Sequence, residues 1–294
     1  MTARRIEVRL RDGAVSLLHW PAQARVSRPP IHFAHANGFN AQTYDSLLAP
    51  LAKGRDVYAW DARGHGFSQL PADPEKQKSW RIYAADLIAT LDALPGGPFV
   101  LGGHSMGATI SLLAAGQRPD LVRGLVLAEP VILPERVRLM AQAAKALGFY
   151  DRIMPMAAQA SNRRKSWPNA QAAFDSYRGR GAFKTWPDRM LSDYLGGGLA
   201  SVSDGPEVTL GCAPAWEAAN YRAGPPSVWA SLKNITVPIQ LLSGGARSTC
   251  PESVARALVR RSKVLKWMHF PECSHFLPME RPQSVADSLQ AIDE

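Results

Sequence analysis

The feature that most constrains this chain is a serine held between two glycines in the segment 103–107, which reads GHSMG. The β-rich run PFVLGG leads into this segment, and the helix-like run ATISLLAAGQ follows it directly. So tight a turn from strand to helix strains the serine backbone, and small residues are required two positions before and after it. Gly103 and Gly107 meet that requirement. A bare G-x-S-x-G pattern occurs by chance in roughly one chain in ten of this length, but its place between strand and helix predicts that Ser105 is a nucleophile.

The same turn sets Ser105 at the start of a helix. Free backbone N–H groups and the helix dipole favour developing negative charge at this position. We therefore expect the Met106 N–H group to stabilise an oxyanion that forms when Ser105 attacks a carbonyl.

Short β-rich runs alternate with amphipathic runs of helix length, which predicts an α/β fold with helices covering a mostly parallel sheet. The expected strands are RIEVRL, AVSLLHW, PIHFAHA, DVYAWD, PFVLGG, RGLVLAE, PIQLLSG and VLKWMHF. The expected helices are Thr43 to Leu51, Ser79 to Leu94, Met106 to Gln117, Pro251 to Arg261 and Pro282 to Ile292.

The alternation is interrupted once, between residues 134 and 232. This stretch shows helical fragments broken by Pro and Gly, and it is rich in aromatic residues, with Trp167, Trp186, Trp216 and Trp229 among them. We expect a core of residues 1–133 and 233–294 and an inserted helical cap of residues 134–232. The aromatic content suits a lid over an apolar binding site, although packing within the lid explains many of these side chains equally well.

Two further segments carry a resemblance to a known family. Residues 33–39, FAHANGF, resemble the His-Gly oxyanion loop of the α/β-hydrolase family, with Ala36 where glycine is usual, and residues 61–68, DARGHGFS, resemble that family's turn after the fourth strand. The resemblance covers nearly the whole chain. It implies an α/β-hydrolase fold, namely a mostly parallel eight-stranded sheet flanked by helices with the cap inserted after strand 6. It also implies that the Asn37 N–H group is the second oxyanion donor and that His35 and His65 fix loops.

The resemblance assigns the general base to His275. The segment 271–282, PECSHFLPMERP, follows the last expected strand and precedes the last expected helix, where this family places its catalytic histidine. Its imidazole would take the Ser105 proton during attack and return it to the leaving group.

The acid departs from the usual family pattern. Family members place an aspartate in the loop after the seventh strand, at a position that here holds Arg247. An arginine cannot orient the imidazole N–H group, and its charge opposes imidazolium formation. Glu129, at the end of the sixth strand, is our expected acid, because one group of haloalkane dehalogenases in this family places its acid there. Two alternatives stay open: Arg247 pairs with Glu129 in a dead site, or it holds Glu129 ionised and oriented.

Composition limits the partners of the chain. Lys and Arg exceed Asp and Glu to give a formal charge of +9, but they are scattered, so we expect no nucleic-acid partner; an anionic substrate or acyl carrier is the alternative to a solvated basic surface. Cys212, Cys250 and Cys273 have no metal-like or redox-like spacing and are expected to be reduced packing residues. No signal-peptide core and no apolar run of about 18 residues is present, so we expect a cytoplasmic protein without stable membrane insertion. No metal or organic cofactor is expected.

These observations favour a serine hydrolase that cleaves a carboxylic ester, or a related thioester or lactone, through an acyl-enzyme on Ser105. The substrate is expected to be a small molecule with an apolar acyl group. The alternatives are a catalytically silent binding protein of the same fold and a hydrolase of carbon–carbon bonds.

Overall fold

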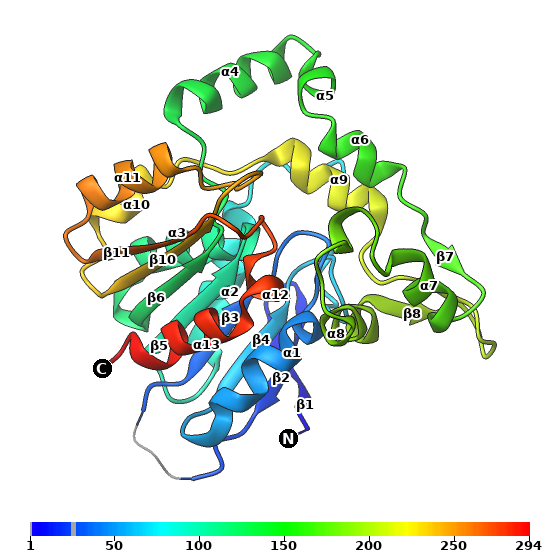
Figure 1. Ribbon diagram of the computed structural model, residues 1–294, viewed down its shortest axis with the longest axis horizontal. Helices are drawn as coiled ribbons and strands as arrows, with labels where there is room; N and C mark the ends of the chain where they lie inside the picture. Colours follow the sequence, from blue (N-terminus) through cyan, green and yellow to red (C-terminus); the bar gives the residue numbers. More distant parts are fainter. Residues whose placement is uncertain (1, 25–27) are drawn as a thin grey trace.

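The computed structural model describes residues 2–24 and 28–294, and its centre is an eight-stranded sheet with the order β1-β2-β4-β3-β5-β6-β10-β11 (Figure 1). All eight expected strands are present. Their bounds are β1 Arg4–Leu10, β2 Gly13–Trp20, β3 Ile31–Ala34, β4 Val57–Asp61, β5 Phe99–His104, β6 Val122–Ala128, β10 Ile239–Gly244 and β11 Leu265–Phe270. Only β2 runs antiparallel to its neighbours, so the expectation of a mostly parallel sheet is confirmed.

Parallel pairing in the middle of the sheet places the functional segments at one edge. His104, the last residue of β5, pairs with Ala128, the last residue of β6. The Ser105 N–H group then donates to the Ala128 carbonyl at 3.0 Å, and the Glu129 N–H group donates to the Leu242 carbonyl of β10 at 2.8 Å. The residues that follow these neighbouring strands are thus held side by side by backbone hydrogen bonds.

Helices cover both faces of the sheet, each over its own buried apolar cluster. One face carries α2 Arg81–Ala93, α3 Met106–Gln117, α10 Trp229–Lys233 and α11 Glu252–Arg261, and the other carries α1 Asp45–Leu48 and α13 Pro282–Ala291. The expected helix from Thr43 to Leu51 is instead a sequence of short turns, with 3₁₀ segments at Ala41–Tyr44 and Ala49–Lys53 on either side of α1.

Most of the segment between β6 and β10 lies above the carboxyl ends of the strands (Figure 1). Its helices are α4 Glu135–Ala146, α5 Tyr150–Ile153, α6 Met156–Ser161, α7 Ala170–Tyr177, α8 Asp188–Gly198 and α9 Pro214–Ala223, with a 3₁₀ segment at Gly181–Phe183. It also contains a small sheet that the sequence did not predict, formed by β7 Ser166–Trp167, β9 Val208–Leu210 and β8 Leu199–Ser201. These strands are two or three residues long, too short to show a period.

The expected end of the insertion at residue 232 falls inside α10. This helix packs on α3 of the core, where the Asn234 side chain donates to the Gly116 carbonyl at 3.0 Å. The tryptophans of the insertion mostly serve packing: Trp167, Trp186 and Trp216 are buried, and the Trp216 indole donates to the Arg63 carbonyl at 2.9 Å.

Candidate active site

Ser105 lies in the strained turn that its glycines predict. Its φ of 57° is in the left-handed region that side chains rarely adopt. A Cβ atom on Gly103 would lie 2.6 Å from the Ala108 nitrogen, and one on Gly107 would collide with the Ala34 carbonyl. Only glycine fits at these two positions, so the tight turn that places Ser105 at the cavity depends on them.

His275 faces Ser105 from the loop between β11 and α12 (Leu277–Glu280). Its Nε2 atom lies 3.0 Å from the Ser105 Oγ atom. The loop is fixed by Ser274, whose N–H and hydroxyl groups donate to the Glu280 carboxylate at 2.6 and 2.7 Å. The ring is therefore placed to accept the hydroxyl proton of Ser105.

Glu129 approaches the other nitrogen of the same ring. Its Oε2 atom lies 3.2 Å from His275 Nδ1, its side chain is fully buried, and its φ of 51° is again left-handed. A residue continuing the extended path of β6 would direct its side chain differently, so the left-handed backbone at Glu129 redirects the carboxylate. The structure thus brings the expected nucleophile, base and acid into one row.

The loop after β10, which lacks the usual aspartate, holds the Glu129 carboxylate in place. Oε1 accepts hydrogen bonds from the Gly244 N–H group and the Ser248 hydroxyl, and Oε2 accepts one from the Thr249 N–H group at 3.0 Å. These donors fix the orientation of the buried carboxylate and leave Oε2 facing His275 Nδ1.

The suggestion that Arg247 pairs with Glu129 is wrong. Arg247 is exposed, and no hydrogen bond or ion pair joins it to Glu129 in the described part of the chain. Its φ of 66° places it at the outer corner of the turn, while the next two residues face inward to Glu129. Backbone N–H groups and a hydroxyl, and not the guanidinium, orient the Glu129 carboxylate.

Sequence reasoning missed Thr249. Its hydroxyl donates to the Glu129 backbone carbonyl at 2.9 Å, and its oxygen lies 3.1 Å from His275 Nδ1. Since the hydroxyl proton is used on the carbonyl, the oxygen is free to accept, and the Nδ1–H group is shared between Thr249 and Glu129. Only the fold brings this residue to the ring, so no local motif could have revealed it.

The two expected oxyanion donors, Asn37 and Met106, line the same cavity as Ser105 and His275. Neither of their backbone N–H groups donates a hydrogen bond to any other described residue. The Asn37 side chain is held by α9: its amide donates to the Glu217 carbonyl at 3.0 Å and accepts from Asn220 at 2.9 Å. The backbone of this loop is thus free for a ligand while its side chain is fixed.

His35 and His65 fix this loop, as the resemblance implies. His35 Nε2 accepts from the Ala62 N–H group at 2.9 Å, and His65 Nε2 accepts from the Gly38 N–H group at 3.1 Å. Burial lowers the pKa of His35 to about 4 and that of His65 to about 3, so both rings are neutral and able to accept.

The cavity over Ser105 has a volume of about 370 Å³ and is mostly apolar. Its apolar wall includes Phe39, Met106, Val131, Met154, Phe183 and Phe276, and the segment between β6 and β10 supplies much of it. A polar cluster around Arg163 interrupts this wall. Arg163 donates to the Glu217 carboxylate at 2.7 Å and to the hydroxyl groups of Tyr177 and Tyr194 at 3.1 and 2.8 Å.

Residues 2–24 and 28–294 contain neither a candidate metal site nor a candidate membrane-spanning helix. No group of three or more His, Cys, Asp or Glu side chains there is arranged to hold a metal ion. No helix in this part of the chain combines the length and the apolar character needed to cross a membrane.

The chain belongs to the alpha/beta hydrolase family, whose sequence model matches residues 33–288. Esterase Rv0045c of Mycobacterium tuberculosis is 24% identical over 291 residues, which are 97% of this chain and 88% of the esterase. Mouse monoglyceride lipase is 36% identical over 147 residues, so the match spans only 47% of this chain and about half, 48%, of the lipase. The crystal structure of E-2-(acetamidomethylene)succinate hydrolase has the same fold, with a TM-score of 0.78 at 20% identity over 99% of both chains.

Proposed function

We propose that this protein is a serine hydrolase that cleaves carboxylic esters, or related thioesters and lactones, through an acyl-enzyme on Ser105. The observation that carries the proposal is the row of three side chains, with 3.0 Å from Ser105 Oγ to His275 Nε2 and 3.2 Å from His275 Nδ1 to Glu129. An ionised carboxylate on Nδ1 keeps the proton on that nitrogen, which leaves Nε2 free to act as the base.

The reaction then follows in two halves. His275 takes the Ser105 proton as Oγ attacks the ester carbonyl, and the oxyanion accepts from the N–H groups of Asn37 and Met106. The tetrahedral intermediate collapses to the acyl-enzyme as the imidazolium returns its proton to the leaving alcohol. Water, deprotonated by His275, attacks the acyl-enzyme and releases the acid.

The relatives and the cavity limit the class of substrate that we propose. An esterase and a monoglyceride lipase are among the curated relatives, and a cavity of about 370 Å³ with an apolar wall suits a small apolar acyl group. A cytoplasmic location, which the free thiols of Cys212, Cys250 and Cys273 favour, is part of the same proposal.

An active-site fluorophosphonate probe tests the function without knowledge of the substrate. We expect the purified protein to be labelled and the labelling to be absent in Ser105→Ala. A folded sample that takes up no probe would instead support the alternative of a catalytically silent binding protein. A series of 4-nitrophenyl esters of graded acyl length then measures how long an acyl group the cavity accepts.

A further inference from the structure

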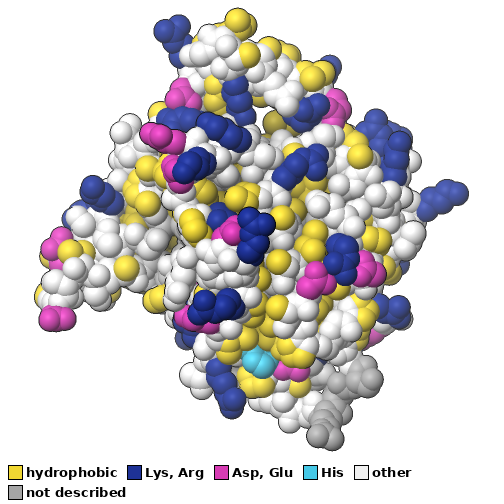
Figure 2. Space-filling view, turned by 180° about the vertical axis from the view of Figure 1, so that it is seen from behind, with side chains coloured by type: hydrophobic (Ala, Val, Ile, Leu, Met, Phe, Trp, Pro, Cys, Tyr) yellow, Lys and Arg dark blue, Asp and Glu magenta, His cyan; other side chains and the backbone are white. Residues whose placement is uncertain are grey.

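A second hollow opens beside the active-site cavity, between α4, the segment 78–81 and the segment 223–227. We call this hollow the basic vestibule. Its volume is about 540 Å³, and its cationic side chains are Lys78, Arg81, Arg138 and Lys145. Among the described residues, no Asp or Glu lines it. The chain carries an excess of positive charge that is otherwise spread over its surface, as Figure 2 shows for one face. A hollow whose charged lining residues are all cationic therefore differs from the rest of the surface.

Three of these four cations have no carboxylate partner. Arg138 is neutralised by Glu135 at 2.7 Å, but no ion pair joins Lys78, Arg81 or Lys145 to an acidic group of the described chain. Lys145 is half-buried, and its ammonium group donates to the Ala223 carbonyl at 2.7 Å and lies 4.8 Å from the Tyr150 ring. Burial lowers the pKa of Lys145, which shows that its charge is incompletely solvated.

The vestibule adjoins the cavity over Ser105. Leu133, Tyr150, Gly224 and Pro225 line both spaces. The segment that bears Lys78 is also joined to the oxyanion loop, because Gln77 donates to Asn220 at 2.7 Å and Asn220 donates to Asn37 at 2.9 Å. A ligand that occupies both spaces would pass Tyr150 and keep one end at the nucleophile.

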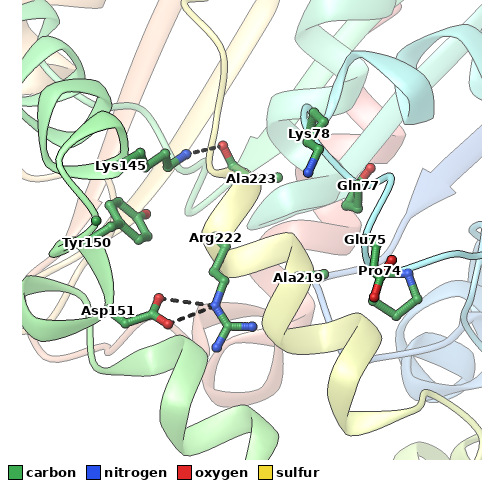
Figure 3. A pocket seen from close by; sticks show the side chains of 11 residues that line it. Pro74, Glu75, Gln77, Lys78, Lys145, Tyr150, Asp151, Ala219, Arg222 and Ala223 are labelled. Atoms are coloured by element: carbon green, nitrogen blue, oxygen red, sulfur yellow. Dashed lines mark hydrogen bonds and ion pairs between the residues drawn. The ribbon is translucent and has the colours of Figure 1, made fainter.

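Figure 3 shows a third hollow, which Lys145 also lines and whose volume is about 560 Å³. Lys145 and Tyr150 lie on one side of it, Lys78 and Gln77 lie on the other, and α9 lies between them. Here the charges are mixed, because Glu75 and Asp151 also line the space and Asp151 pairs with Arg222 at 3.0 Å. Lys78 and Lys145 line both hollows, but of the two only the basic vestibule lacks acidic lining residues and shares several lining residues with the catalytic cavity.

We propose that the basic vestibule binds an anionic group, a carboxylate or a phosphate, that the substrate carries at a distance from its scissile ester or thioester bond. This inference rests on the proposed function and names its substrate class. The alkyl part of such a substrate lies in the apolar cavity, and the anionic end leaves it past Tyr150. Ammonium and guanidinium groups bind carboxylates and phosphates through charge-assisted hydrogen bonds, which are stronger where water is partly excluded.

Arg163 does not provide this recognition. It lines the active-site cavity, but its guanidinium already pairs with the Glu217 carboxylate at 2.7 Å. An anionic group placed there would meet the carboxylate of Glu217 as well as the cation. Lys78, Arg81 and Lys145 of the basic vestibule have no such carboxylate partner among the described residues.

The experiment compares matched substrates in two arms. In the first arm the anion lies in the acyl half: the 4-nitrophenyl monoester of a dicarboxylic acid is compared with the neutral 4-nitrophenyl alkanoate of the same length. In the second arm the anion lies in the leaving half: an acyl coenzyme A thioester is compared with the N-acetylcysteamine thioester of the same acid. The readout in each arm is the ratio of kcat/KM for the anionic substrate to that for its neutral partner.

In one arm we expect the ratio to fall by about ten-fold in Lys145→Gln and further in the double variant Lys78→Gln/Lys145→Gln. The fall is expected because these variants lose charged hydrogen bonds to the anionic group. The ratio should also fall as salt is added. Lys263→Gln, which removes an exposed charge between α11 and β11, is the matched control and should leave the ratio unchanged. The arm that responds tells which half of the substrate carries the anion.

Ratios that are the same in the native protein and in both lysine variants, in both arms, overturn the inference. That failure is distinct from failure of the proposed function. Fluorophosphonate labelling of Ser105 reports the nucleophile alone, whereas the ratio reports recognition by an enzyme already shown to be active.

Discussion

His104 donates a hydrogen bond from its Nε2–H group to the backbone carbonyl of His275, at 2.8 Å. A carbonyl only accepts, so this contact leaves Nδ1 of His104 as an acceptor for the Tyr44 hydroxyl at 2.9 Å. The Tyr44 oxygen in turn accepts from the Ala36 N–H group at 3.2 Å. Buried hydrogen bonds thus connect the loop of the base, the strand of the nucleophile and the oxyanion loop.

We expect His104→Phe to lower kcat by about ten-fold and the free energy of unfolding by about 1–3 kcal/mol, because it leaves the His275 carbonyl and the Tyr44 hydroxyl unpaired in the interior. Steady-state hydrolysis of a short 4-nitrophenyl ester and urea unfolding measure the two effects. His32→Phe is the matched control, since His32 is a buried strand histidine whose ring nitrogens have no hydrogen-bond partner among the described residues. An equal loss of kcat in both variants would argue that His104 acts only through the core.

Glu129→Gln should lower kcat by a factor on the order of 10² to 10⁴. A carboxamide has one acceptor oxygen where the Gly244 and Thr249 N–H groups and the Ser248 hydroxyl converge. If the amide nitrogen faces His275, Nδ1 must accept, the ring proton moves to Nε2, and the base toward Ser105 is lost. Arg247→Ala is the control and should change kcat little, because Arg247 is exposed. Near-normal turnover of a folded Glu129→Gln protein would remove Glu129 from the mechanism.

The sequence predicted the parts of this molecule that depend on local chemistry. The nucleophile Ser105 could be predicted from the glycines of its turn alone. The strands could be predicted from their apolar runs, because a parallel sheet buried on both faces selects nearly continuous apolar residues. Glu129 could be predicted because the usual acid position was visibly occupied by Arg247. The first two inferences used residues adjacent in the chain, and the third used the family resemblance.

The remainder depends on contacts between distant segments. Thr249 reaches His275, and Asn220 reaches Asn37, only because β10 and α9 are folded against the catalytic edge. The left-handed backbone at residues 129 and 247 is unexpected for Glu and Arg, which favour other regions, and it is imposed by the hydrogen bonds around the carboxylate. Arg247 does not pair with Glu129, as both open alternatives had supposed, because its side chain is exposed.

Arg163→Met should destabilise the protein by about 3–5 kcal/mol, because it leaves the buried Glu217 carboxylate without its cation. The double variant Arg163→Met/Glu217→Gln removes both charges and should recover a large part of the loss. Urea unfolding of the three proteins measures this, and a double variant no more stable than Arg163→Met would show that the pair is not coupled. The pair lies beside the oxyanion loop, since a Cβ atom on Gly38 would be 2.7 Å from the Glu217 carboxyl carbon.

The buried histidines make the fold sensitive to acid. Burial lowers the pKa of His32 and His65 to about 3, that of His35 to about 4, and that of His104 well below its usual range, whereas each titrates near 6.5 in an unfolded chain. Between pH 6.5 and 4 the unfolded chain therefore binds protons that the folded protein does not. The histidine contribution to the free energy of unfolding is fully present above pH 6.5 and falls as the pH drops, by up to about 1.4 kcal/mol per pH unit for each histidine.

Urea unfolding at pH 7.5, 6.5 and 5.5 measures this loss mostly above the pH range in which carboxylates titrate. The variant His65→Gln should reduce the slope of the free energy of unfolding against pH by the share of one histidine. A free energy of unfolding that stays constant or rises from pH 7.5 to 5.5 would contradict the neutral state of these rings, on which the oxyanion loop and the His104 hydrogen bonds both depend.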